Sequence, residues 1–392
     1  MTRIHGLDLA RALAIIGMMA AHLGPEAFLT DGYPSVLFAV LAGVSMGVIS
    51  RGVADGAGDL LRTRFRLILR GVILVGLGAF LALAQAGIYE VLSAIGLSYL
   101  LLTPVVRWPV RRLAVLLGGL VLLGPVLAVL DHVLSISWGD EGVADVLFGV
   151  YPLLAWLAYV LVGLLIHRLV VRAEEPGRQV RLLVAGLVIF AAAQLTAELT
   201  GFGTGPDDVL TGSGAYLQAE PHSGGLLDVL SSAGAAMAVI AACLLACRVA
   251  AVVWASYPLR AMGAMSLTVY VVHVIVTTIA NGTFVTVRSV YDGGPQPYLP
   301  KGDFGWGMYT PLTDASEGAS ASFEPGFPGY LDEPVYGDPG VGDPNWLGMF
   351  AAQLIVFLIF ASLWRRRLRR GPLEWGVHRV TEGTVGPVPE RR

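Results

Sequence analysis

Apolar stretches long enough to cross a lipid bilayer constrain this chain more than any other feature of its sequence. Ten of them lie at residues 9–29, 34–50, 66–86, 89–106, 112–130, 147–168, 179–199, 226–254, 259–281 and 346–368. A helix needs about 20 apolar residues to cross the hydrocarbon core, where the backbone must satisfy its own hydrogen bonds. We therefore expect an all-α, polytopic membrane protein, a bundle of about ten transmembrane helices. The stretches 34–50 and 89–106 are short, which predicts tilted or irregular segments covered by protein.

The composition excludes a soluble fold and gives no reason to expect a nucleic-acid partner. Hydrophobic residues make up 55% of the chain and charged residues 14%, whereas soluble domains carry about 25% charged residues. The net charge is −3, which is not the basic balance of a nucleic-acid binder. Lys301 is the only lysine, and such a bias towards arginine is typical of high-GC bacterial genomes. We expect a multi-pass protein of a bacterial cell membrane.

The arginines are concentrated in alternate connections between the apolar stretches. They are Arg51, Arg62, Arg64 and Arg66, then Arg107, Arg111 and Arg112, then Arg168, Arg172, Arg178 and Arg181, then Arg248 and Arg260, and finally the run 365–370. With ten crossings, all of these lie on one side of the membrane, and the intervening connections are acidic. Because short basic loops stay in the cytoplasm, we expect both termini to be cytoplasmic.

One connection is much longer than the others and divides the chain. Residues 282–345 are rich in glycine, proline, aspartate and aromatic residues and show no helical or strand periodicity. Loops of this length are functional or disordered, and the sequence leaves both a folded lid and a disordered segment open. We expect a core of nine helices over 1–281, an extracytoplasmic loop over 282–345, and the last helix with a basic tail over 346–392.

The two cysteines indicate neither a metal site nor a disulfide. Cys243 and Cys247 are spaced i,i+4 within an apolar stretch, so both lie on one helix face. A zinc site needs further ligands nearby, and a disulfide within one helix is poorly placed. We expect packing residues and no bound metal.

Polar residues of the first apolar stretch form one stripe. Eleven residues make about three helical turns, so Arg11 and His22 share a face, with Asp8 one turn before and Glu26 one turn after. No small-residue cleavage site ends the stretch, so we expect it to be retained as a helix. Ionisable groups inside a membrane are costly and mark function by default. The alternatives are a snorkelling Asp8–Arg11 pair at the interface and a histidine that only packs.

A second polar stripe lies in the stretch 259–281. Its members are spaced i, i+4, i+7 and i+11 and are Ser266, Tyr270, His273 and Thr277. If the helix is continuous, His273 reaches the same depth as His22, in the outer half of the membrane. Whether the two histidines face each other is open. Imidazoles exchange protons near neutral pH, so such a pair suits proton abstraction or nucleophilic acyl transfer, although helix packing explains the stripe as well.

Four arginines precede or enter the stretch 66–86. They are Arg62, Arg64, Arg66 and Arg70. One interpretation is topology anchoring beside lipid headgroups, which the sequence alone favours. The other is a cytoplasmic phosphate site, because guanidinium groups bind phosphates bidentately.

The first polar stripe resembles a known signature. Asp8-x-x-Arg11 followed by x10-His22 is similar to the first-helix motif of membrane acyltransferases of the acyltransferase-3 type. The runs 7–14 and 37–43 resemble heparan-α-glucosaminide N-acetyltransferase-like proteins.

A closer resemblance is to the bacterial YeiB-like multi-pass family. It rests on Gly263-x-x-Ser266-Leu267-Thr268-x-Tyr270 and on the sharper marker Gly371-Pro372-Leu373-Glu374-Trp375. The resemblance covers roughly 1–110 and 255–380.

The acyltransferase resemblance implies an activity and a division of roles. An acyl group, most simply acetyl, would pass from cytoplasmic acyl-CoA to an extracytoplasmic hydroxyl or amine of a glycan or glycolipid. Arg11 would position this donor, His22 would act as general base or acyl carrier, and the basic residues from Arg62 to Arg70 would hold the CoA phosphates. An oxyanion stabiliser is needed, for which Tyr270 and Arg11 are candidates. No permanently bound cofactor is implied.

Two other functions fit the same residues. In a small-molecule or lipid transporter, the buried polar stripes would line a pathway and the histidines would relay protons. In a membrane scaffold they would only pack. A transporter needs an ion gradient and not CoA, and a scaffold needs neither.

Overall fold

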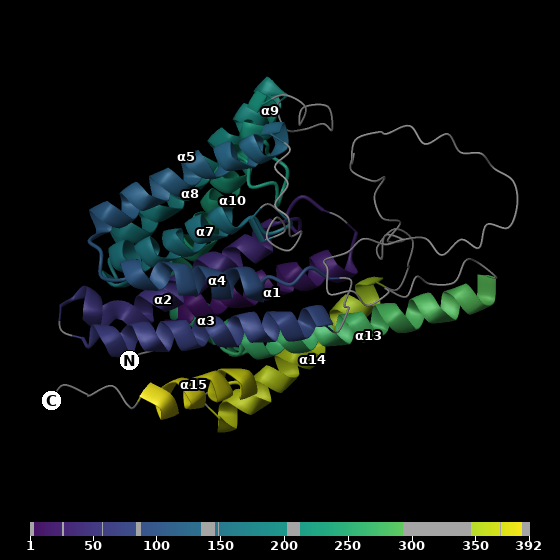
Figure 1. Ribbon diagram of the computed structural model, residues 1–392. Helices are drawn as coiled ribbons and strands as arrows, with labels where there is room; N and C mark the ends of the chain where they lie inside the picture. Colours follow the sequence, from purple (N-terminus) through teal and green to yellow (C-terminus); the bar gives the residue numbers. More distant parts are fainter. Residues whose placement is uncertain are drawn as a thin grey trace, which may run out of the picture.

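A computed structural model describes residues 4–25, 27–56, 58–83, 88–134, 146–147, 149–201, 212–292, 346–368 and 370–385. Within these ranges every regular element is a helix (Figure 1). Eight described helices are long and apolar enough to cross a membrane, and a bent pair makes up to nine. The chain is therefore an all-α polytopic membrane bundle, as the apolar stretches predict.

The helices follow one another along the chain with short connections. They are α1 (His5–Leu23), α2 (Tyr33–Ala54), α3 (Leu60–Leu83), α4 (Leu92–Leu102) with the 3₁₀ turn η1 (Thr103–Val105), α5 (Val110–Leu134), α7 (Leu153–Ile166) with the π-helical turn η2 (His167–Val171), α8 (Pro176–Thr200), α9 (Gly212–Leu217), α10 (Leu226–Ala246), α11 (Ala250–Ala255), α12 (Tyr257–Gly263), α13 (Ser266–Asp292), α14 (Trp346–Arg367) and α15 (Pro372–Val385).

Two expected boundaries are wrong near the N-terminus. The first helix ends at Leu23 rather than at residue 29, because Pro25 disfavours helical geometry at Gly24. Glu26, the expected fourth member of the polar stripe, lies outside the described residues. The stretch 34–50 is not short, since α2 has 22 residues. The stretch 89–106 does form a short helix, α4, of 11 residues.

Two stretches expected as single helices are divided. The stretch 226–254 gives α10 and α11, which separate at the basic end, where Arg248 donates a hydrogen bond to Gln179 on α8 at 2.8 Å. The stretch 259–281 gives α12 and α13, whose axes differ by 82° across the break. α13 then continues to Asp292, past the expected loop start at 282. Residues 293–345 lie outside the described part, and so does the question of a lid.

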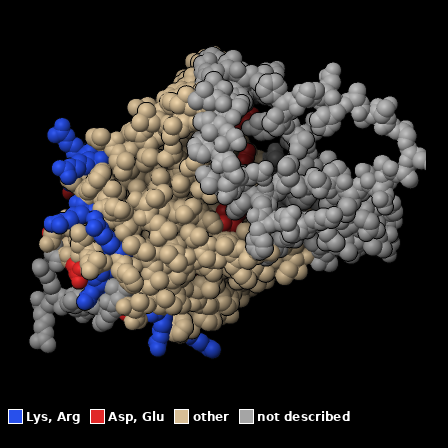
Figure 2. All heavy atoms as spheres, in the orientation of Figure 1, with Lys and Arg blue, Asp and Glu red and all other residues tan. Residues whose placement is uncertain are grey.

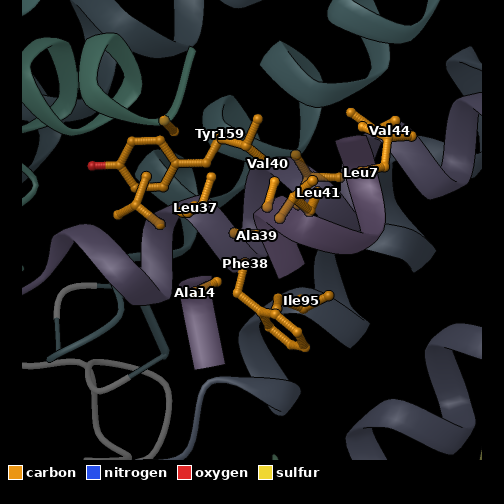
Figure 3. Packing of buried hydrophobic residues seen from close by; sticks show 14 of the residues in the cluster. Leu7, Ala14, Leu37, Phe38, Ala39, Val40, Leu41, Val44, Ile95 and Tyr159 are labelled. Atoms are coloured by element: carbon orange, nitrogen blue, oxygen red, sulfur yellow. The ribbon is translucent and has the colours of Figure 1, made fainter. Parts of the chain in front are cut away.

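The helices form an inner and an outer layer. α7 is the most enclosed, followed by α2, α10 and α1, whereas most of α3, α5, α8 and α14 faces outward with apolar side chains. Figure 3 shows the interior, where Phe38 and Leu41 of α2 pack with Ile95 of α4 and Tyr159 of α7. An apolar exterior around an apolar interior is what a lipid surrounding requires.

Charge is concentrated at one end of the bundle. Both termini lie at the same end in Figure 1, and the arginines on the visible face gather there in Figure 2. α1 begins at this end, so Asp8 lies near it and His22 lies towards the opposite end.

Candidate functional site

The two histidines predicted to lie at one depth are in contact. His22, in the last turn of α1, places Nδ1 2.9 Å from Nε2 of His273 on α13. Their ring planes are within 5° of parallel, and the ring centroids are 5.2 Å apart. His273 is fully buried, whereas His22 is partly exposed. The pair therefore joins a hidden imidazole to one that reaches an accessible edge.

Gln353 extends the pair into a chain of three side chains. Its Oε1 lies 3.0 Å from Nδ1 of His273, and its Nε2 donates to the hydroxyl of Thr277 at 3.3 Å. Thr277 in turn lies 3.2 Å from the same Nδ1. An amide oxygen only accepts, so Nδ1 of His273 carries the proton and Nε2 accepts from Nδ1–H of His22. Nε2 of His22 is then left with its lone pair free to take a proton.

Gln353 was missed by the sequence analysis. It is the one amide within α14, whose other residues up to the arginines at 365–367 are almost all apolar. A lone amide in an apolar span is the signal that marks it, because an unpaired polar group in hydrocarbon costs several kcal/mol, roughly. Its partner lies 80 positions earlier in the sequence, and no local pattern identifies that partner.

Tyr270 lies on the same helix but has a different partner. Its hydroxyl accepts a hydrogen bond from the backbone N–H of Val91 at 3.1 Å, and its ring stacks on Phe38 at 5.8 Å. These contacts tie α13 to the start of α4 and to α2. Ser266 begins α13. The role of Tyr270 as an oxyanion stabiliser stays a prediction.

Asp8 and Arg11 form a buried ion pair nearer the basic end. Nη1 of Arg11 lies 3.2 Å from Oδ1 of Asp8, and its Nη2 donates to Oγ of Ser45 on α2 at 2.9 Å. Arg365 on α14 approaches the other Asp8 oxygen at 3.7 Å. The side chain of Asp8 is only 2% exposed, so this is an interior network and not a snorkelling pair in water.

The four arginines of α3 separate into two groups. Arg62 pairs with Asp59 at 3.6 Å near the surface, and Arg64 donates to the carbonyl of Pro104 at 2.7 Å. Arg66 is partly buried. Arg70 lies deeper, with its guanidinium carbon 5.9 Å from the ring centroid of Tyr99.

Tyr99 links Arg70 to the ion pair on α1. The charge of Arg11 acts on Tyr99 as well as that of Arg70, and the Tyr99 hydroxyl donates to the carbonyl of Ala42 at 2.6 Å. Arg70 and Arg11 therefore flank one buried tyrosine. This grouping and the histidine pair lie on the same side of α1, one near each end.

The described residues contain no group of three or more histidine, cysteine, aspartate or glutamate side chains able to hold a metal ion. Cys243 is buried, Cys247 is half-buried, and both are free thiols.

The comparison with known families gives one match. Residues 339–384 match the model of a family described as a protein of unknown function (DUF418). No curated protein matches the chain. The match supports the expected YeiB-like resemblance over the C-terminal part of the chain, including Gly371 to Trp375, and says nothing of acyl transfer.

The matched segment contributes three polar contacts to the rest of the molecule. Gln353 binds His273, Arg365 approaches Asp8, and Glu374 binds the first turn of α13. The segment that carries the family likeness therefore touches both ends of the candidate site.

Proposed function

We propose that this chain is a membrane-embedded acyltransferase that moves an acyl group, most simply acetyl, from acyl-CoA to an extracytoplasmic hydroxyl or amine of a glycan or glycolipid. One observation carries the proposal. The chain from Gln353 through His273 to His22 leaves a single basic nitrogen, Nε2 of His22, at an accessible edge of an otherwise apolar bundle.

The reaction needs one base and returns its proton. Nε2 of His22 takes the proton of the acceptor O–H or N–H as that atom attacks the thioester carbonyl carbon. The tetrahedral intermediate then expels the CoA thiolate, which takes the proton back from the imidazolium. His273 accepts a hydrogen bond from Nδ1–H of His22, and Gln353 holds His273 in the tautomer that allows this. An acyl-imidazole on His22 is the two-step variant of the same chemistry.

The donor would lie along α1. Its phosphates suit the guanidinium groups of Arg11 and Arg70, and its thioester lies at the far end of a flexible arm. Arg11 and His22 share a face of α1 and are separated by about 16 Å along the axis. The proposal places the arginine end in the cytoplasm, because basic connections remain there.

Binding and turnover test the proposal separately. Calorimetry of CoA and acetyl-CoA with the protein in detergent should give saturable binding that Arg70→Ala weakens about tenfold, by loss of one charge-assisted contact. Arg181→Ala, an exposed arginine on α8, is the matched control and should bind as wild type. Release of CoA thiol from acetyl-CoA, with glucosamine as a trial acceptor, should be lost in His22→Ala.

Absence of CoA binding to well-folded protein would contradict the proposal. Proton-driven uptake of a solute into proteoliposomes without CoA would instead support the transporter, in which the same histidine pair relays protons.

A further inference from the structure

α13, the helix that carries His273, starts at a sharp break. α12 ends at Gly263 and α13 begins at Ser266, with the two axes 82° apart. A helix start exposes backbone N–H groups that have no partner within the helix. Inside a membrane protein such groups need an acceptor from elsewhere.

Glu374 on α15 supplies that acceptor. Its Oε1 accepts from the backbone N–H groups of Leu267 at 2.7 Å and Thr268 at 3.2 Å. Its Oε2 accepts from the Thr268 hydroxyl at 2.6 Å. The same hydroxyl accepts from the N–H of Leu373, in the first turn of α15, at 3.1 Å. Each helix therefore caps the other.

Close backbone approaches fix the break on two sides. A Cβ at Gly371 would lie 2.3 Å from Oε2 of Glu374 and 2.8 Å from Cβ of Met265. A Cβ at Gly263 would lie 1.8 Å from the carbonyl oxygen of Asp8 on α1. Glycine at these two positions lets α1 and α15 grip the break from different directions.

We propose that Glu374 is a positioning residue for His273, an inference that rests on the proposed acyl transfer. His273 lies two turns beyond the capped end, about 10 Å along the axis. A tilt of α13 about its start moves His273 against His22, which α1 holds separately. Misplacement by about 1 Å can lower a rate about 100-fold. The carboxylate therefore acts on catalysis through the 2.9 Å contact between the two imidazoles.

The test compares Glu374→Ala, Glu374→Gln and Glu382→Gln. Glu382 lies on the same helix and pairs with His378 at 2.8 Å, so its variant is the matched control. Glu374→Ala should lower kcat for CoA thiol release at least about tenfold, with KM for acetyl-CoA within about twofold. Glu374→Gln keeps an acceptor oxygen and should recover part of the rate. A second readout is the ¹⁵N NMR coupling between His22 Nδ1 and His273 Nε2, which should be lost in Glu374→Ala and kept in Glu382→Gln.

The outcomes separate this inference from the proposed function. Folded Glu374→Ala protein with wild-type kcat and the coupling intact would overturn it. Equal losses of kcat and of CoA binding would also overturn it, since they indicate general damage. If wild-type protein releases no CoA, the acyl transfer fails and the NMR coupling alone decides whether Glu374 positions His273.

Discussion

At the scale of single residues, Gln353 determines which imidazole nitrogen is basic. Replacing it with alanine removes the acceptor at Nδ1 of His273, so both histidines can change tautomer. We expect Gln353→Ala to lower kcat for CoA thiol release at least about tenfold while CoA binding stays unchanged, because an orienting group acts through the base. Gln353→Glu, which retains an acceptor, should recover activity. Gln194→Ala on α8 is the control, and an equal loss in that variant would contradict the assignment.

A second residue-scale prediction concerns His222, in the connection before α10. Burial lowers the pKa of His222 from 6.5 to about 4, and its ring packs edge-on against Tyr151. As pH falls from 6.5 to 4 the unfolded chain takes up a proton that the folded chain does not, so stability is present above pH 6.5 and is lost towards pH 4. The loss is at most about 3 kcal/mol, at 1.4 kcal/mol per pKa unit.

Thermal unfolding in detergent at several pH values measures this effect. His222 has a φ of 67°, which asparagine tolerates better than most residues. His222→Asn should therefore fold and should lack this part of the acid destabilisation. An identical pH dependence in both proteins would show that another group is responsible.

Much of the site could be predicted residue by residue, because an ionisable group in an apolar stretch stands out. Asp8, Arg11, His22 and His273 were found in this way. Gln353 and Glu374 were not assigned to the site, since their importance depends on partners far away in the sequence. The contact between the histidines was left open for the same reason: periodicity gives a face of a helix but not the neighbour of that face.

At the scale of elements, the crossing of α2 and α7 depends on two glycines. A Cβ at Gly43 would lie 1.9 Å from the carbonyl oxygen of Val160, and a Cβ at Gly163 would lie 1.9 Å from that of Val40. Neither carbonyl can move without separating the helices. Gly163→Ala should destabilise the protein by about 1–3 kcal/mol or more, as overpacking does, and lower its unfolding temperature. Gly119→Ala on α5 has nothing within 4 Å and is the control. Equal unfolding temperatures for the two variants would refute the prediction.

The break between α12 and α13 shows where hydropathy stops being informative. The residues at the break, Gly263, Ala264 and Met265, are apolar and include no proline, so the stretch 259–281 reads as one helix. The bend comes from contacts with α1 and α15, which are long-range in sequence. The end of α1 was predictable in principle, because Gly24 and Pro25 are helix-ending residues.

At the scale of the whole molecule, charge sets the orientation. The arginines lie at the end that holds both termini, as Figures 1 and 2 show. Because short basic segments resist export, we expect this end to face the cytoplasm, with the histidine pair in the outer half. An acyltransferase of the proposed kind needs this orientation, since CoA is cytoplasmic and the acceptor is outside.

Labelling of single cysteines in intact cells tests the orientation directly. Cys243 and Cys247 are the only cysteines, and replacing both with alanine gives a clean background. Asp31→Cys, exposed between α1 and α2, should react with a membrane-impermeant maleimide added outside. Glu382→Cys on α15 should react only after the cells are opened. The reverse pattern would invert the bundle and place the arginines around Arg11 and Arg70 outside. It would remove the donor from the reach of His22 and contradict acyl transfer from cytoplasmic acyl-CoA, whatever the geometry of the histidine pair.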